Sequence, residues 1–348
     1  MNQIDDNKII MKITIKEIAK ALNVSTATVS KAMQDYPDIS NGTKKKVKEY
    51  AEKIGYEPNI YAAFLRTKKT RLIGIVVPDL NTSFYSELVA SLIIKIIENR
   101  YLPIVLNSNE SEQLECENLE RLMRQKVDGI FISLTKNTTS TDYLTKVMSS
   151  SCSLIAFSNI SKIVTCNKVV FNDKEIIKQA TEYLINKGNS KIAFIRKSLI
   201  SQNSINQFIG FREAHQKHEI LIDNKRIVIS NKDTMSEGYR IAKELFNSGV
   251  QIDGFIAYND TLALGAMIFY KENGFDMPKE IRFIGQENLE IGTFFTPELT
   301  SIEQNISLMA EKIMSLFLEE QAELKQKKIS SFKRKEIKAK LIERASSL

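Results

Sequence analysis

The chain has 348 residues, 43% of them hydrophobic and 26% charged, which predicts folded domains and excludes wholesale disorder. A chain of this length is expected to form two or three domains. No run approaches the ~20 apolar residues that a membrane-spanning helix needs, and residues 1–10 lack the apolar segment of a signal peptide. We therefore expect a cytoplasmic protein without a membrane partner.

The net charge of +7 is concentrated near the N-terminus, where residues 1–71 hold 12 Lys and 2 Arg against 8 Asp and Glu. A local basic excess is typical of a domain that binds a polyanion such as DNA, although a solubilising surface gives the same signature. A second basic cluster at residues 325–340 is interpreted as a solvated edge or a strand. Residues 1–11 are interpreted as a short disordered tail ahead of the fold, and the alternative is that Met11 is the true start.

Three short helices are predicted between residues 14 and 55. Thr14 and Glu17 have the spacing of a capping box, and apolar residues then follow at helical intervals as far as Leu22. Asn23 tolerates the left-handed conformation that ends a helix. Ser25 can cap a second helix directly afterwards, so a tight turn joins the two helices.

The second helix is predicted to face outward with small or basic residues. These are Thr26, Ala27, Ser30 and Lys31. Ser40 caps a third helix, which Gly55 closes. Two short helices joined by a tight turn are typical of a helix-turn-helix, whose second helix fits the DNA major groove. A small helical accessory bundle is the alternative interpretation.

From residue 71 onward, β-rich apolar runs alternate with amphipathic helical patterns. The first set of predicted strands is 72–77, 102–106, 129–133 and 154–157, and the second is 169–171, 191–195, 226–229, 255–258 and 282–285. Helical patterns include 83–99, 173–186, 235–247 and 261–271. The predicted fold class is an all-α helix-turn-helix head followed by a two-lobed α/β domain with two doubly wound parallel sheets. A cleft between such lobes is a natural small-ligand site.

Several stretches resemble the LacI/GalR family of repressors. In the head they are ITIKEIAKALNVS at 13–25, TVSKAM at 28–33, PDIS at 37–40 and GYEPN at 55–59. They continue with LRTKKT at 65–70, IGIVVPD at 73–79, VDGI at 127–130, ND at 259–260 and LTSIE at 299–303. The resemblance covers nearly the whole chain from Met11. It implies a DNA-binding head at 1–57, a hinge helix or linker at 58–70, and a periplasmic-binding-protein-like, effector-binding and dimerisation domain at 71–348.

The resemblance implies a set of residues that contact double-stranded operator DNA. They are Thr14, Ile15, Lys16, Ser25, Thr26, Ala27, Ser30, Lys31, Thr43, Asn59, Ala62 and Leu65. Thr26, Ala27 and Lys31 would read bases, and Lys31 replaces a more frequent Arg, so guanine is recognised by a point charge rather than a fork. The two serines and Thr43 would bond phosphates. Leu65, in the hinge, would wedge into a base step from the minor groove.

The resemblance also implies that a small metabolite, often a sugar in this family, binds between the lobes. The residues expected to contact it are Phe84, Tyr85, Ser158, Asn159, Phe171, Gln207, Asn259, Asp260 and Glu287. Gln207 stands where the family usually has an Arg that binds sugar hydroxyls, and Glu287 stands in place of an Asp. We therefore predict a ligand that differs from a plain free hexose, or a weakly responsive sensor.

One head buries too little surface for tight specific binding, so we expect a homodimer on a pseudo-palindromic operator. The apolar faces of residues 87–99 and 309–321 are a candidate dimer interface, or equally two core helices. A repressor is the first hypothesis, and an activator or a regulator controlled by a protein partner is the alternative. Whether the effector is an inducer or a corepressor, and whether the assembly is a dimer or a tetramer, stays open.

Enzymatic and metal-binding motifs are not found in the sequence. Neither GxGxxG nor GxxxxGK[ST] occurs, so we predict no enzyme and no cofactor. Cys116, Cys152 and Cys166 lack CxxC spacing, and His215 and His218 have no third ligand nearby, so no metal site is predicted. A transporter's solute-binding protein would share the two lobes, but it would need an export signal and would lack the head.

Overall fold

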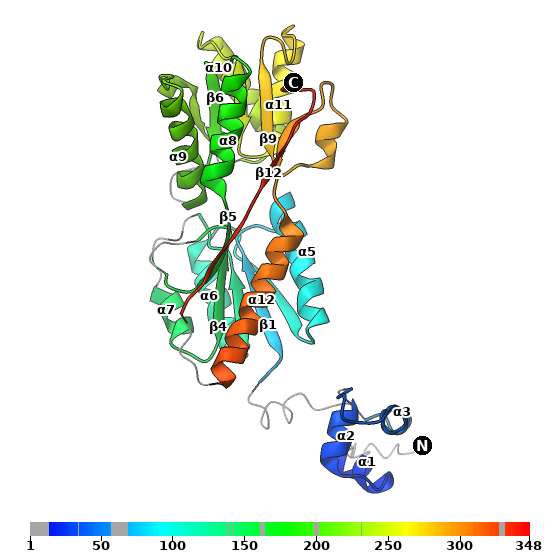
Figure 1. Ribbon diagram of the computed structural model, residues 1–348. Coiled ribbons are helices and arrows are strands. Elements are labelled where there is room, and N and C mark those ends of the chain that lie inside the picture. Colours follow the sequence, from blue (N-terminus) through cyan, green and yellow to red (C-terminus); the bar gives the residue numbers. More distant parts are fainter. Residues whose placement is uncertain are drawn as a thin grey trace, which may run out of the picture. The chain divides into compact units, whose positions relative to one another are not determined.

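The computed structural model describes residues 14–33, 35–56, 69–136, 138, 140, 142–160, 164–197, 202–230, 232–326 and 331–348. The chain divides into two compact units, Met1–Thr70 and Arg71–Leu348 (Figure 1). Each unit has its own hydrophobic core. Within the described ranges, no helix is long and apolar enough to cross a membrane.

The first unit is a three-helix head. Its helices are α1 (Ile15–Ala21), α2 (Thr26–Met33) and α3 (Asn41–Lys53). Its core consists of Ile18, Ala19, Val29, Ala32, Val47 and Ala51. These residues recur at helical spacing along the chain, so each helix turns one apolar face toward the other two.

The predicted helix ends of the head are confirmed. The backbone N–H of Thr14 donates to the Glu17 carboxylate at 2.6 Å, as a capping box requires. Asn23 has a φ of 49°, the left-handed conformation that ends α1. The Ser25 hydroxyl accepts from the backbone N–H of Thr28 at 3.0 Å and so caps α2. These bonds fix the tight turn that sets α2 across α1.

The second unit has two lobes, each built on a six-stranded sheet (Figure 1). In the first lobe the strand order is β11-β5-β4-β3-β1-β2. The strands are β1 (Leu72–Val77), β2 (Leu102–Asn107), β3 (Gly129–Ile132), β4 (Ser153–Phe157), β5 (Asn167–Phe171) and β11 (Arg334–Ile337), all parallel. Helices α5 (Ser83–Glu98) and α12 (Ile306–Lys325) cover one face. Helices α6 (Glu112–Arg124) and α7 (Asp142–Met148) cover the other.

In the second lobe the strand order is β12-β10-β9-β8-β6-β7. The strands are β6 (Ile192–Arg196), β7 (Ile227–Ile229), β8 (Gly254–Ala257), β9 (Arg282–Gln286), β10 (Thr300–Glu303) and β12 (Lys340–Ile342), of which only β12 is antiparallel to its neighbour. Helices α8 (Asp173–Asn186) and α9 (Gln202–Lys217) cover one face, and α10 (Met235–Asn247) and α11 (Asp260–Glu272) the other. Two short 3₁₀ helices, Asn224–Arg226 and Glu290–Thr293, complete the lobe.

The chain passes between the two lobes three times, from β5 to α8, from β10 to α12 and from β11 to β12. The third passage is visible in Figure 1 as one long segment that runs along both lobes. The predicted strand 169–171 was expected in the second lobe, which is wrong, because β5 belongs to the first sheet. The basic cluster at 325–340 supplies β11, so its interpretation as an edge or a strand is confirmed.

Helices α5 and α12 pack against each other, and both contribute to the core of the first lobe. Leu88 and Phe317 are fully buried there. The same two helices also carry exposed apolar side chains, with Ile94 56%, Ile97 58% and Leu324 52% exposed. Both ranges, 87–99 and 309–321, therefore contain core residues, so the core-helix interpretation is confirmed. Exposed apolar side chains lie in both as well, with Leu318 36% exposed in the second, and the dimer interface stays a prediction.

Close packing of α10 on α11 yields a stability prediction. A methyl group at Gly238 would overlap the backbone carbonyl oxygen of Leu262, which has no flexible side chain to move aside. We expect Gly238→Ala to lower the free energy of unfolding by about 1–3 kcal/mol, the usual cost of overpacking. Urea denaturation of the full chain checks this. Lys243→Ala, at an exposed position of the same helix, is the control; equal stability of the two variants would contradict the prediction.

Candidate functional site

Helix α2 presents the side chains predicted to read bases. Thr26, Ala27 and Lys31 are exposed on the surface of the head. Ser30 is only 7% exposed, so the prediction that it faces outward is wrong. Ser30 directly follows the core residue Val29 and is buried beside it, and its contact with a phosphate stays a prediction.

Lys31 is held by an ion pair with Asp38, a residue of the loop that precedes α3. The two side chains are 46% and 52% exposed, so this pair lies at the protein surface. The hydrogen bond from Lys31 lowers the pKa of the Asp38 carboxyl below its ordinary value. A lysine in such a pair must leave its carboxylate before it can bind a base edge.

The other predicted DNA contacts divide into placed and unplaced residues. Lys16 is exposed on α1, whereas Ile15 packs against the core of the head. The Thr43 hydroxyl lies 2.9 Å from that of Ser40 at the start of α3. The hinge contacts Asn59, Ala62 and Leu65 lie outside the described residues.

A cavity of about 180 Å³ lies between the lobes of the second unit. Its walls include six of the predicted effector-binding residues: Phe84, Tyr85, Ser158, Asn159, Gln207 and Glu287. The lobes meet across it, since the Asn203 amide donates to the Ser158 hydroxyl at 3.5 Å. Phe84 and Tyr85 lie at the start of α5, with their rings 5.0 Å apart edge to face.

Three predicted ligand contacts have other roles in the structure. Phe171 is 2% exposed and lies behind Phe84, at a ring distance of 6.1 Å. The buried Asp260 carboxylate accepts from the Leu289 N–H and the Ser301 hydroxyl, at 2.6 Å each. Phe171 and Asp260 are therefore not among the residues that line the cavity.

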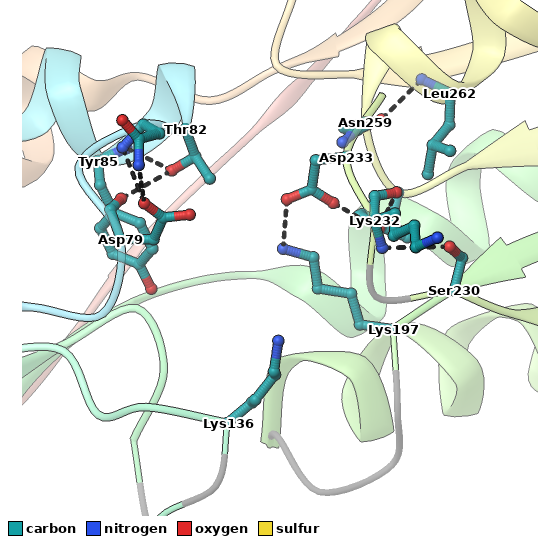
Figure 2. A network of polar contacts seen from close by, with 12 residues as sticks. Asp79, Thr82, Tyr85, Lys136, Lys197, Ser230, Lys232, Asp233, Asn259 and Leu262 are labelled. Carbon is teal, nitrogen blue, oxygen red and sulfur yellow. Dashed lines mark hydrogen bonds and ion pairs between the residues drawn. The ribbon is translucent and has the colours of Figure 1, made fainter. Parts of the chain in front are cut away.

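Asn259 lies beside an adjoining hollow rather than on the cavity itself. Its side-chain oxygen accepts from the Leu262 N–H at 2.8 Å and caps α11. This bond occupies the amide oxygen with a structural role, and it is visible at the upper right of Figure 2.

The deep wall of the cavity is an amide and carboxyl network. The Gln207 amide donates to Asp173 at 3.4 Å and to the Gln286 side chain at 3.3 Å. All three side chains are less than 9% exposed, and all three line the cavity. Burial raises the pKa of Asp173 to about 7, although the bond from Gln207 opposes that rise. Near neutral pH this wall therefore offers hydrogen bonds from a carboxyl that is only partly ionised.

The opposite part of the cavity is charged, as Figure 2 shows. Lys197, just after β6, pairs with Asp233 at 3.3 Å, and the Tyr258 hydroxyl donates to the same carboxylate. Lys136, in the loop after β3, points into the space beside them. The sequence prediction missed these residues, although each follows the carboxyl end of a strand in its sheet, where open α/β folds bind ligands.

Glu287 has an unusual backbone conformation at the same cavity. Its φ is 103°, a value that L-residues rarely adopt. Burial raises the pKa of its carboxyl to about 8, and the charge of Lys197 only partly offsets this. Strained backbone of this kind concentrates at functional sites, because the surrounding structure must hold it in place.

A helix-turn-helix head followed by a two-lobed domain with a polar cavity defines a ligand-responsive DNA-binding regulator. Profile comparison agrees. Residues 14–59 match the family described as bacterial regulatory proteins, lacI family, and residues 70–343 match the family of periplasmic binding proteins and sugar binding domain of LacI family. The chain belongs to the LacI family of transcriptional regulators, which are not enzymes.

Relatives of known name are similar over most of their length. The chain is 26% identical over 312 residues to catabolite control protein A of Priestia megaterium, covering 88% of this chain and 93% of that protein. It is 28% identical over 300 residues to the HTH-type transcriptional regulator DegA of Bacillus subtilis, covering 86% and 88%.

Solved structures show the same fold. The lac repressor dimer bound to operator and the anti-inducer ONPF has a TM-score of 0.81 at 21% identity, covering 97% of this chain and 99% of that one. The complex of the transcriptional regulator CelR with cellobiose has a TM-score of 0.70 at 20% identity, covering 96% and 99%.

The raised pKa of Asp173 predicts a pH dependence of stability. Between about pH 4, the ordinary pKa of an aspartate, and its folded value of about 7, the folded state keeps a proton that the unfolded state has lost. The free energy of unfolding therefore falls as pH rises through this window. We expect Asp173→Asn to reduce that fall, measured by urea denaturation at several pH values; the raised pKa of Glu287 keeps a part of it.

The matched control is Glu175→Gln, at an exposed position of the same helix, which should leave the pH profile as it is. If Asp173→Asn and wild type lost the same stability between pH 4.5 and 7.5, the carboxyl of Asp173 would have an ordinary pKa.

Proposed function

We propose that this LacI-family regulator is a repressor that binds a pseudo-palindromic operator as a homodimer in the cytoplasm, with its affinity set by a small metabolite in the cavity. The observation that carries the proposal is the exposed face of α2. Thr26, Ala27 and Lys31 lie together there on a head whose turn and caps match a DNA-reading unit. A recognition helix with small residues and one cation can approach base edges closely.

Dimerisation is supported by the surface on α5 and α12. Ile94, Ile97 and Leu324 are exposed apolar side chains on two helices that pack side by side. Exposed apolar side chains on neighbouring helices are a candidate interaction surface. Two heads double the contact area with DNA, and a two-fold axis explains why the operator would be a palindrome. The similar lac repressor was solved as a dimer on its operator.

The ligand proposed for the cavity is a small, polar, carbohydrate-related molecule. Support comes from the hydrogen-bonding wall of Asp173, Gln207 and Gln286, and from the aromatic pair Phe84 and Tyr85 on the other lobe. The hydroxyl groups of a sugar can hydrogen-bond to the polar wall, and the flat face of its ring can stack on Phe84 and Tyr85. The similar regulator CelR was solved with cellobiose. Gln207 in place of an arginine favours a ligand other than a plain hexose.

Selection of bound duplexes from a random DNA library tests the function. The purified full chain should enrich one symmetric sequence, and a duplex of that sequence should compete better than scrambled DNA at moderate salt. Enrichment of a single half-site would contradict the dimer. Enrichment of no sequence, with and without candidate metabolites, would remove the proposed function altogether.

Lys31 and Asp38 give a paired prediction for the selected operator. Lys31→Ala should weaken binding about ten- to a hundredfold, because a charged contact to a base edge is lost. Asp38→Asn should instead tighten binding by up to about fivefold, because Lys31 no longer has to leave a carboxylate. Fluorescence anisotropy measures both, with Lys243→Ala on the effector-binding domain as the control. Weaker binding by Asp38→Asn would show that the pair positions Lys31 rather than restrains it.

A further inference from the structure

Two lysines approach the cavity from opposite lobes. Lys136 lies in the loop after β3 of the first lobe, and Lys197 lies directly after β6 of the second. In Figure 2 their amino groups point into one space, bounded by Asp79 and Tyr85 on one side and by Asp233 on the other. Two amino groups that share a cavity repel each other unless an anion lies between them.

Three described residues after β3 have backbone N–H groups that donate to acidic side chains of the first lobe. The backbone N–H of Lys136 donates to Glu110 at 2.8 Å, and that of Ser140 donates to Glu112 at 2.8 Å. The buried Glu115 carboxylate accepts from the Thr135 N–H at 2.8 Å. The backbone is therefore preorganised, and the aliphatic chain of Lys136 leaves it toward the cavity.

The amino group of Lys136 has no ion pair among the side chains in the described ranges. Lys197 has one, with Asp233, but that carboxylate already accepts from the Tyr258 hydroxyl. Asp233 can therefore keep a partner when Lys197 turns toward a ligand. Among the described residues, Lys136 therefore has no ion pair, whereas Lys197 can exchange its pair with Asp233 for one with a ligand.

Five acidic side chains line the cavity beside the two lysines, and each is engaged in its own way. Burial raises the pKa of Asp173 to about 7 and that of Glu287 to about 8, so neither carries a full negative charge near neutral pH. Asp79 accepts from the backbone and the side chain of Asn81, at 2.9 and 3.0 Å, and so stabilises its own turn. Glu110 and Asp233 also line the cavity, but Glu110 accepts from the Lys136 backbone N–H and Asp233 pairs with Lys197. The ammonium group of Lys136 is therefore left to pair with a ligand.

We propose that Lys136 and Lys197 form an anion clamp, which binds an acidic substituent, a phosphate or a carboxylate, on the small molecule that this cavity accepts. The polar wall formed by Asp173, Gln207 and Gln286 holds the uncharged part of that molecule. A phosphate oxygen or a carboxylate oxygen accepts charge-assisted hydrogen bonds from both amino groups, which are the stronger kind.

The clamp has a consequence for regulation, which rests on the proposed function. An anion held by one lysine from each lobe is bound tightly only when the lobes are closed, because an open cleft separates the two amino groups. Such a ligand has a different affinity for each state and therefore shifts the population of closed molecules. A neutral sugar of the same size lacks this contact.

Isothermal titration calorimetry on the full chain tests the clamp, with glucose, glucose 6-phosphate, glucuronate and inorganic phosphate as probes. We expect at least one of the two sugar anions to bind more tightly than glucose, and which one binds tells phosphate from carboxylate. Lys136→Gln should weaken that binding about ten- to a hundredfold, and Lys197→Gln should weaken it in the same direction. Lys243→Gln, at an exposed position of α10, should have no effect.

Three outcomes overturn the proposal: glucose binding as tightly as both sugar anions, no detectable binding of either anion at millimolar concentration, or full affinity in Lys136→Gln. Titration with inorganic phosphate distinguishes binding at the basic head from binding in the cavity. If wild type and Lys136→Gln bind phosphate equally, that phosphate is not bound by the clamp. Thermal unfolding without anions verifies that each variant is folded. Operator binding is measured separately on wild type. If the chain binds the anion but no operator, the proposed function is wrong and the clamp is still supported.

Discussion

Asn172 joins two of the three connections between the lobes by hydrogen bonds. Its backbone N–H donates to the Ile337 carbonyl at 3.1 Å, and its side-chain oxygen accepts from the Ala339 N–H at 2.7 Å. Because the first and third passages of the chain share these bonds, they are the natural place for a hinge between the lobes. Whatever binds between them therefore acts on one variable, the opening of the cleft, and only through contacts that differ between open and closed states.

Local signals in the sequence were sufficient for the head and for most strands. The caps at Thr14 and Ser25 and the left-handed Asn23 depend on neighbouring residues alone, so their chemistry is visible in the chain. The lobe of β5 could not be predicted, because an apolar strand has the same pattern in either sheet. Strand β12 was not predicted, since it is short and begins with a lysine, as edge strands often do.

The site was predictable only as far as the resemblance reached. It gave six residues of the cavity wall, but it did not give side-chain direction, so Phe171 and Asp260 were assigned to a cavity that they do not line. Lys136 and Lys197 were missed, because a lysine in a loop is usually a solvated surface charge. Only the sheet topology shows that their two loops face each other across one cleft.

Gln207 determines how charge is distributed inside the cavity. An arginine at this position would face Asp173 with a permanent positive charge and would hold its carboxyl ionised. The neutral amide of Gln207, 3.4 Å away, stabilises the ionised carboxylate only weakly. Burial therefore dominates, and the pKa of Asp173 rises to about 7. The deep wall then carries only part of a negative charge near neutral pH, while both lysines of the cavity enter from the other side. A cavity of this kind selects a ligand by the position of its charge, which a uniformly charged cleft cannot do.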